Sequence, residues 1–218
     1  MKKITSETPA FEKNVCLLAE SRITNGICNI FYTEKEDICK IKKSAYYMLN
    51  ALRYSSLITN LSELRACDIT AMFISQASAA AYIAAEKGKS VCFDAPSIGH
   101  MITCRPKLLE YAVLLLISNE FIYKDSVNIS LKVSKSTVGI YCSTSLPDKS
   151  SIEYSVIKKA AEAHSGRLIS YRNGIIHKTI ISFPIKPVDR NAANYEIKYP
   201  YEIITDKFSP AVTVLSQI

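Results

Sequence analysis

The sequence predicts an α+β fold in which a helical hairpin precedes a domain of mixed helices and strands. In the first third, apolar residues recur at alternating steps of three and four, which is typical of helices that pack in bundles. The remainder alternates helical periods with short strands of alternating polarity. The chain has 218 residues, of which 48% are hydrophobic and 22% charged. This composition supplies enough apolar side chains for one or two cores.

The predicted hairpin occupies residues 1–64. Its first helix opens at Thr8-Pro9, and its second begins after Glu36 and Asp37, whose charges suit a helix N-terminus. The turn is expected near residues 32–35. The apolar side of the first helix comprises Phe11, Val15, Leu18 or Ala19, Ile23, Ile27 and Ile30.

The second helix carries a narrow apolar seam with the spacing of a bundle. Such a short hairpin cannot bury both of its faces alone. We therefore predict a homodimer with a four-helix bundle, while docking of the hairpin on the rest of its own chain without a dimer stays open. The predicted dimer seam comprises Ile38, Ile41, Ala45, Met48 and Leu52.

Residues 65–218 form the predicted second domain. Asp68 can cap a helix over 69–86, and Pro106 opens a nearly all-apolar helix over 107–122. A third helix, from Ser150 or Ser151, ends before Gly166. The expected strands are 90–93, 127–133, 137–142, 167–171 and 175–184, with a small apolar run at 100–103 and a turn at Asn173-Gly174. An extension from about residue 186 adds polar linker and two further strands, at 195–204 and 211–215.

Composition excludes several kinds of site. Only 6 residues are glycine, whereas average usage of roughly 7% would give about 15. Phosphate loops need glycine because a Cβ blocks close approach of the backbone to an anion, and no such loop motif is present. The 7 cysteines are scattered without metal-ligand spacing, and we expect reduced thiols that lie mostly in the core.

The chain shows no charged-then-apolar leader and no apolar stretch long enough to span a membrane. We therefore expect a cytoplasmic protein without membrane contact. The net charge of +7 is spread along the chain and allows an acidic partner without indicating one.

The stretch from Leu108 to Lys178 resembles the catalytic ATP-binding domain of sensor histidine kinases. The words "LLEYAVLLLISNEFIY", "EAHSGRL" and "ISFP" carry the match. Ahead of them, "LAESRITNGICNIF" stands where the family has its phosphoaccepting H-E-L-R-T-P-L motif. The resemblance covers most of residues 10–185. It implies a two-layer α/β sandwich of the histidine kinase ATPase type behind a dimerisation and phosphotransfer hairpin.

The residues that the family uses for nucleotide binding are mostly absent. Of the two N-box asparagines that orient magnesium and triphosphate, Asn119 matches the second and Leu115 replaces the first. Asn119 is thus the one candidate cofactor-binding residue, and an equally open alternative is that it only caps its helix. No aspartate stands where the family binds adenine, since Ser143 is nearest and Asp148 lies several residues further on.

The second glycine box is lost as well. Glu153 lies where the family's glycines let a helix N-terminus meet the phosphates, and its charge would repel them. No glycine occurs between Gly139 and Gly166. At the phosphoacceptor position stands Leu18 or Ala19, neither of which has a nucleophilic atom.

The three histidines, His100, His164 and His177, lie outside the first helix. We interpret His164 as a structural helix-end residue and the other two as surface or strand residues. No Ser-His-Asp, Cys-His or zinc spacing occurs among them.

The resemblance then implies a degenerate, histidine-kinase-like protein in two-component-type signalling. It would have no catalytic residue, cofactor or metal, and would act by binding, with a response regulator or a kinase as a candidate partner. The alternative is an active histidine kinase or ATPase with divergent glycine boxes, which would hold ATP and magnesium with Asn119 and Asp125 or Asp148. A third hypothesis is a nucleic-acid site formed by Lys35, Lys40, Lys42 and Lys43 beside Tyr46 and Tyr47. A lysine cluster of this kind is more often a solvated helix face.

Overall fold

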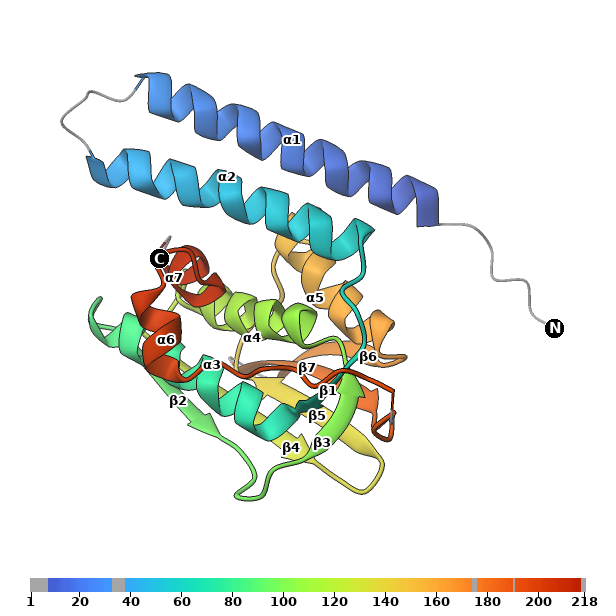
Figure 1. Ribbon diagram of the computed structural model, residues 1–218. Helices are drawn as coiled ribbons and strands as arrows, with labels where there is room; N and C mark the ends of the chain where they lie inside the picture. Colours follow the sequence, from blue (N-terminus) through green and yellow to red (C-terminus); the bar gives the residue numbers. More distant parts are fainter. Residues whose placement is uncertain (1–7, 33–37, 174–175, 190, 217–218) are drawn as a thin grey trace.

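The computed structural model arranges the chain in three tiers, with the helical hairpin above a layer of helices and a sheet below them (Figure 1). It describes residues 8–32, 38–173, 176–189 and 191–216. The helix layer and the sheet form the expected two-layer sandwich. The α+β class and the hairpin predicted from the sequence are therefore confirmed.

The hairpin consists of α1, Thr8–Tyr32, and α2, Ile38–Thr59. The two long helices run side by side (Figure 1). Val15 and Ala19 are buried on the side of α1 that was predicted to be apolar, but Ile27 is 44% exposed. Gly26 lies against the side chain of Met48, so the small residue lets the helices approach. The expected turn at 32–35 falls largely outside the described residues.

The second part begins with a strand that the sequence reading missed. This strand, β1, Arg65–Asp68, pairs antiparallel with β3, Met101–Cys104. Four residues between a polar stretch and a helix cap are too few to show an alternating pattern. Asp68 then caps α3, Ile69–Ala85, as predicted, by accepting hydrogen bonds from the backbone N–H groups of Thr70 and Ala71.

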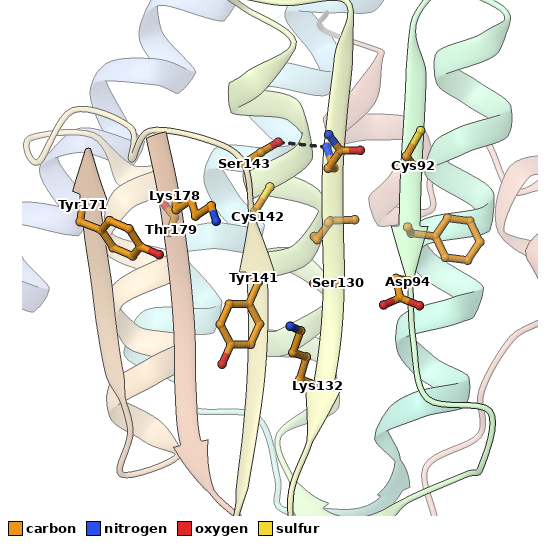
Figure 2. Close-up of a pocket in the computed structure, with 13 residues that line it drawn as sticks. Cys92, Asp94, Ser130, Lys132, Tyr141, Cys142, Ser143, Tyr171, Lys178 and Thr179 are labelled. Atoms are coloured by element: carbon orange, nitrogen blue, oxygen red, sulfur yellow. Dashed lines mark hydrogen bonds between the residues drawn. The ribbon is translucent and has the colours of Figure 1, made fainter. Parts of the chain in front are cut away.

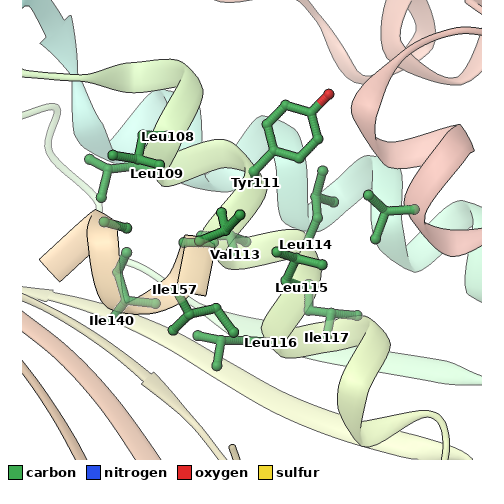
Figure 3. Packing of buried hydrophobic residues seen from close by; sticks show 14 of the residues in the cluster. Leu108, Leu109, Tyr111, Val113, Leu114, Leu115, Leu116, Ile117, Ile140 and Ile157 are labelled. Atoms are coloured by element: carbon green, nitrogen blue, oxygen red, sulfur yellow. The ribbon is translucent and has the colours of Figure 1, made fainter. Parts of the chain in front are cut away.

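Helix α4, Pro106–Glu120, lies at the centre of the molecule. Its apolar side chains point to every side, toward the sheet, α5 and α7 (Figure 3). This explains why its sequence lacks a polar face, since a helix that is apolar all round is stable only when it is buried. The fully buried side chains of α4 include Leu108, Leu109, Leu114, Leu116 and Ile117.

The main sheet has five strands in the order β2-β4-β5-β7-β6. All neighbours are antiparallel except β2 and β4. Helices α3, α4 and α5 pack on one face of this sheet, and the other face is open (Figure 1). The turn predicted at Asn173-Gly174 lies partly outside the described residues. The elements are β2, Ser90–Asp94; β4, Ser126–Val133; β5, Thr137–Cys142; α5, Ile152–Ala163; β6, Arg167–Asn173; and β7, Ile176–Pro184.

The last segment corrects the sequence prediction. The two strands expected at 195–204 and 211–215 are instead short helices, α6, Pro200–Thr205, and α7, Pro210–Leu215. Each begins with a proline at its first position, and Ser209 caps α7 by accepting from Val212 N–H. The isoleucine, valine and threonine residues that suggested strands are accommodated because the helices bury them against the body. Asn194 makes an isolated β-bridge with Ala66.

The cysteines correct a second expectation. Cys67, Cys104 and Cys142 are buried, as predicted, whereas Cys28, Cys39 and Cys92 are exposed. All seven are free thiols. The prediction that most of them lie in the core was therefore wrong, because three belong to solvent-facing positions of the hairpin and of the edge strand β2.

Candidate functional site

Asn119 lies at the C-terminal end of α4 and faces the loop that joins β5 to α5. Its side chain is 8% exposed. The amide Nδ2 donates to the Ser145 carbonyl oxygen at 2.8 Å and to Thr144 Oγ1 at 3.3 Å. Asn119 therefore holds this loop, which is a structural role close to the capping alternative.

The connection between β5 and α5 is short, and hydrogen bonds fix it to neighbouring elements. Within residues 143–151, Thr144 is fully buried, and its carbonyl oxygen accepts a hydrogen bond from Thr179 Oγ1 at 2.7 Å. At the far end of the loop, Ser151 caps α5 by accepting from the Tyr154 N–H. This connection stands where the resemblance places the loop that covers ATP, and its hydrogen bonds join it to the sheet and to α4.

The N-terminus of α5 is occupied by an ion pair. Arg22 of α1 reaches Glu153 with two hydrogen bonds, of which that between Nη2 and Oε2 measures 2.6 Å. The Arg22 guanidinium also lies over the Tyr47 ring, 4.8 Å from its centroid. From the sequence alone, Glu153 is expected to repel phosphate. The structure adds that its carboxylate is neutralised by a cation from the hairpin.

A cavity of about 510 Å³ lies between these groups. Asn119, Asp148, Glu153 and Arg22 all line it, so the structure brings together Asn119 and one of the two aspartates named for an active enzyme. Asp148 is turned to solvent and accepts from the N–H and Oγ of Ser150, which keeps the pKa of its carboxyl below the ordinary value. Asp125 does not line the cavity and pairs with Lys89 at 3.1 Å.

The phosphoacceptor position has no reactive group in three dimensions either. Ala19 is buried at 4% exposure and Leu18 packs against the core. His164 is buried, accepts from the Arg105 N–H through Nε2 at 2.9 Å and lies 2.6 Å from the Ala160 carbonyl through Nδ1. Its structural role is thus as expected. His100 contacts Thr70, with its Nδ1 3.1 Å from Oγ1, and His177 lies in β7.

The predicted dimer seam lies on α2 with much of its surface uncovered. Ile38 is 73% exposed and Leu52 is 55% exposed. Ala45 is also exposed, whereas Ile41 and Met48 are half-buried. The body of the same chain contacts other residues of α2, including Asn50, whose Nδ2 donates to the Thr213 carbonyl at 2.9 Å. A partner for the seam is not part of the structure, so the dimer stays a prediction.

The lysines of α2 do not form a surface with free aromatic rings. Lys42 lies 5.6 Å from the centroid of the Tyr46 ring, and that ring is only 5% exposed. Tyr47 is covered by Arg22. Lys35 lies outside the described residues. Aromatic faces that are already covered cannot stack with bases, so this cluster gives no support to a nucleic-acid site.

A second depression, of about 520 Å³, lies on the open face of the sheet. Figure 2 shows Tyr141 and Lys132 beside one another on this face, with Tyr171, Lys178 and Asp94 around them. The Lys132 ammonium lies 5.3 Å from the Tyr141 ring centroid. This depression lies on the side of the sheet away from α4 and hence away from Asn119.

Two absences concern the described part of the chain. No group of three His, Cys, Asp or Glu side chains there could hold a metal ion. Over those same ranges, none of the helices combines the length and hydrophobicity that crossing a bilayer requires.

Sequence reasoning missed the residues that depend on distant contacts. Arg22 and Glu153 are 131 positions apart, and no local pattern links them. The contact between Gln76 and Glu110 in the core was not predicted either, because each residue resembles an ordinary polar residue of a helix. A glutamate inside the all-apolar run of α4 is the signal that could have found the second pair.

Comparison with solved structures gives the fold. The Acinetobacter baumannii histidine kinase AdeS matches with a TM-score of 0.54 and 17% identity, over 78% of this chain and 95% of that one. A histidine kinase from Burkholderia phymatum matches with a TM-score of 0.51 and 11% identity, over 84% and 100% of the two chains.

Full-length ShkA, solved in complex with AMPPNP, matches with a TM-score of 0.53 and 13% identity. The match covers 83% of this chain and 47% of ShkA, so the chain spans about half of that longer protein. No protein-family model and no curated protein matches the sequence. The likeness is one of structure, and it shows that the chain has the histidine-kinase-like ATPase fold behind an N-terminal helical hairpin.

Proposed function

We propose that this protein is a non-catalytic relative of sensor histidine kinases, which acts as a binding or regulatory protein in two-component-type signalling. The Arg22–Glu153 ion pair at the N-terminus of α5 is the observation that carries the proposal. A triphosphate would have to displace Arg22 and approach the freed carboxylate of Glu153. Both changes oppose binding, since a helix N-terminus attracts phosphate only when its N–H groups and positive dipole are accessible.

The loop at 143–151 supports the same proposal. Its backbone is tied to α4 by Asn119 and to β7 by Thr179. With its amide nitrogen engaged in this way, the last recognisable N-box residue can offer only its carbonyl oxygen to a magnesium ion. The replacement of the phosphoacceptor by Leu18 or Ala19 removes the second half of kinase chemistry.

The partners follow from the fold and from the exposed seam. The first is a second copy of the chain, docked through the apolar stripe on α2 that contains Ile38 and Leu52. The protein that such a dimer regulates would be a response regulator or a histidine kinase. This assignment comes from the resemblance and from fold analogy alone.

An active enzyme is the alternative, and one observation favours it. Asn119 and Asp148 line the same cavity, which at about 510 Å³ is large enough for a ligand of nucleotide size. ATP and magnesium would then be held there without glycine boxes. For the adenine contact the resemblance calls for an aspartate, and Ser143 is the residue nearest to that position.

Titration calorimetry with a non-hydrolysable ATP analogue and magnesium separates the two. The proposal expects no heat of binding from the wild-type protein, and equally none from the Asn119→Asp variant. Micromolar binding by the wild-type protein would overturn the proposal, and its weakening by this variant would place the nucleotide at Asn119, as the alternative requires. Arg22→Ala combined with Glu153→Ala is the informative second protein, because it removes the guanidinium without leaving a free carboxylate, so binding that appears only in this double variant would identify the ion pair as the block.

A further inference from the structure

A cavity of about 490 Å³ lies between the hairpin, the helix layer and the C-terminal segment. It is distinct from the cavity around Asn119, with which it shares no lining residue. Helices α2, α3 and α4 and the segment from Tyr195 to Pro210 form its walls. The apolar part of the wall comprises Leu57, Tyr111, Ile203, Phe208 and Pro210.

Two polar side chains meet inside this cavity. Gln76 of α3 is 5% exposed and Glu110 of α4 is 8% exposed. The Gln76 Nε2 donates to the Glu110 Oε1 at 3.0 Å. Burial raises the pKa of the Glu110 carboxyl to about 7, although hydrogen bonds from Tyr195 and Gln76 act in the opposite direction.

The other end of the Gln76 amide has no partner. Its Oε1 is buried and accepts no hydrogen bond from any residue that the structure describes. This orientation of the amide fits the ionised form of Glu110, since an oxygen in that position would face another acceptor. A buried acceptor without a donor is unfavourable. Gln76 is one of the residues that line the cavity, which can admit such a donor.

We propose that this cavity binds a small planar heterocycle with two adjacent N–H donors, as on the amide and amino edge of guanine. One donor satisfies Gln76 Oε1 and the other binds the Glu110 carboxylate. The Tyr111 and Phe208 rings and the aliphatic side chains around them cover the ring system. Glutamate is a suitable acceptor for paired N–H groups because its charged oxygens strengthen the hydrogen bonds.

The size and charge of the cavity further restrict the class of ligand that it can bind. Its volume lies within the range of roughly 300–1,000 Å³ that is usual for small-molecule sites. The charged groups around it include both signs, Lys107 and Lys198 with Glu196 and Asp206, and Lys198 lies 3.5 Å from Asp206. This balance favours a neutral ligand, a base or nucleoside, over a polyphosphate.

The cavity lies where three parts of the chain meet, so a bound ligand would contact all of them. Arg53 and Leu57 come from the hairpin, Gln76 and Glu110 from the body, and Ile203 and Phe208 from the C-terminal segment. A ligand in contact with all three would hold the hairpin and the segment in one position on the body. This inference does not depend on whether the protein binds ATP.

Guanosine is the probe, with inosine as the matched ligand because it lacks only the exocyclic amino group. Titration calorimetry at pH 8, where Glu110 is ionised, is expected to give micromolar binding of guanosine. Inosine should bind about tenfold more weakly, as the loss of one buried hydrogen bond implies. The absence of any heat from guanosine at millimolar concentration would overturn the proposal. This is the result expected if a buried water molecule supplies the hydrogen bond to Gln76.

The decisive variant is Gln76→Met, which keeps the volume but removes the amide. Its affinity for guanosine should fall about tenfold, whereas Ser78→Ala, on the same helix but outside the cavity lining, should bind as the wild type does. A thermal melt of each variant establishes that it folds. Unchanged guanosine binding by folded Gln76→Met protein would contradict the assignment.

Discussion

Arg22 in the first helix and Glu153 at the start of α5 form a two-point ion pair that joins the hairpin to the sandwich domain. The side chains are 18% and 24% exposed, so solvent screens the pair only in part. Because Arg22 also packs on Tyr47, one residue links α1, α2 and α5. The contact therefore joins the hairpin to the first turn of α5.

Removal of this ion pair should loosen the hairpin. We expect Arg22→Ala to lower the free energy of unfolding by about 1–3 kcal/mol, because Glu153 then keeps its burial without a cation. Urea unfolding measures the loss, and hydrogen exchange should report faster exchange in α1. The charge-swapped double variant, Arg22→Glu with Glu153→Arg, should recover part of the stability. A single variant with wild-type stability would show that the pair contributes nothing.

Stability should depend on pH through Glu110. The pKa of this carboxyl is raised from 4.5, the value for an ordinary glutamate, to about 7 in the folded protein. Burial is the largest cause of this shift. The folded state therefore retains a proton that the unfolded state loses. The contribution of Glu110 to the free energy of unfolding is therefore largest below pH 4.5. It falls as the pH rises from 4.5 to about 7.

The size of that loss is roughly 3 kcal/mol by linkage. The charged groups that face Glu110 are Lys107 on its own helix and Lys198 on the C-terminal segment, with Gln76 and Tyr195 as hydrogen-bond partners. Glu110→Gln has no such proton to lose. Denaturant unfolding of both proteins between pH 4.5 and 8 should show a downward slope for the wild type that the variant lacks, and parallel slopes would refute the prediction.

The predicted dimer can be tested at Leu52, which is 55% exposed on the α2 seam. A charge in an apolar interface remains unpaired and costs binding energy. Leu52→Glu should therefore shift the protein from dimer to monomer in sedimentation analysis at micromolar concentration. Lys43→Glu places the same carboxylate away from the seam and should leave the dimer intact. A wild-type protein that sediments as a monomer would remove the basis for this interface.

Thiol labelling tests the arrangement of the cysteines. Cys28, Cys39 and Cys92 are exposed and should react within minutes with a maleimide or an aromatic disulfide reagent. Cys67, Cys104 and Cys142 are buried and should react only when the chain unfolds. Burial raises the pKa of Cys142 well above its ordinary value and further slows its reaction. Mass spectrometry of the labelled protein identifies each site, and rapid modification of Cys142 would contradict the fold around β5.

Most elements of the fold can be predicted from the sequence, because their signals are local. Asp68 and Ser151 mark helix starts through side-chain caps, and the apolar run of α4 indicates a buried helix. The same local reading failed where burial overrides propensity. The β-branched residues of α6 and α7 suggested strands, but prolines at the helix starts and packing on the body decided otherwise.

The arrangement of the site depends on contacts that form only when the chain folds. The missing glycines and the single Asn119 are visible in the sequence, and they predict a degenerate nucleotide site. Only the folded chain shows that Asn119 is engaged with the loop at Ser145 and that Arg22 lies against Glu153. It also brings Gln76 and Glu110 together. These contacts join residues far apart in sequence, and their energies depend on burial and on distances that no periodicity encodes.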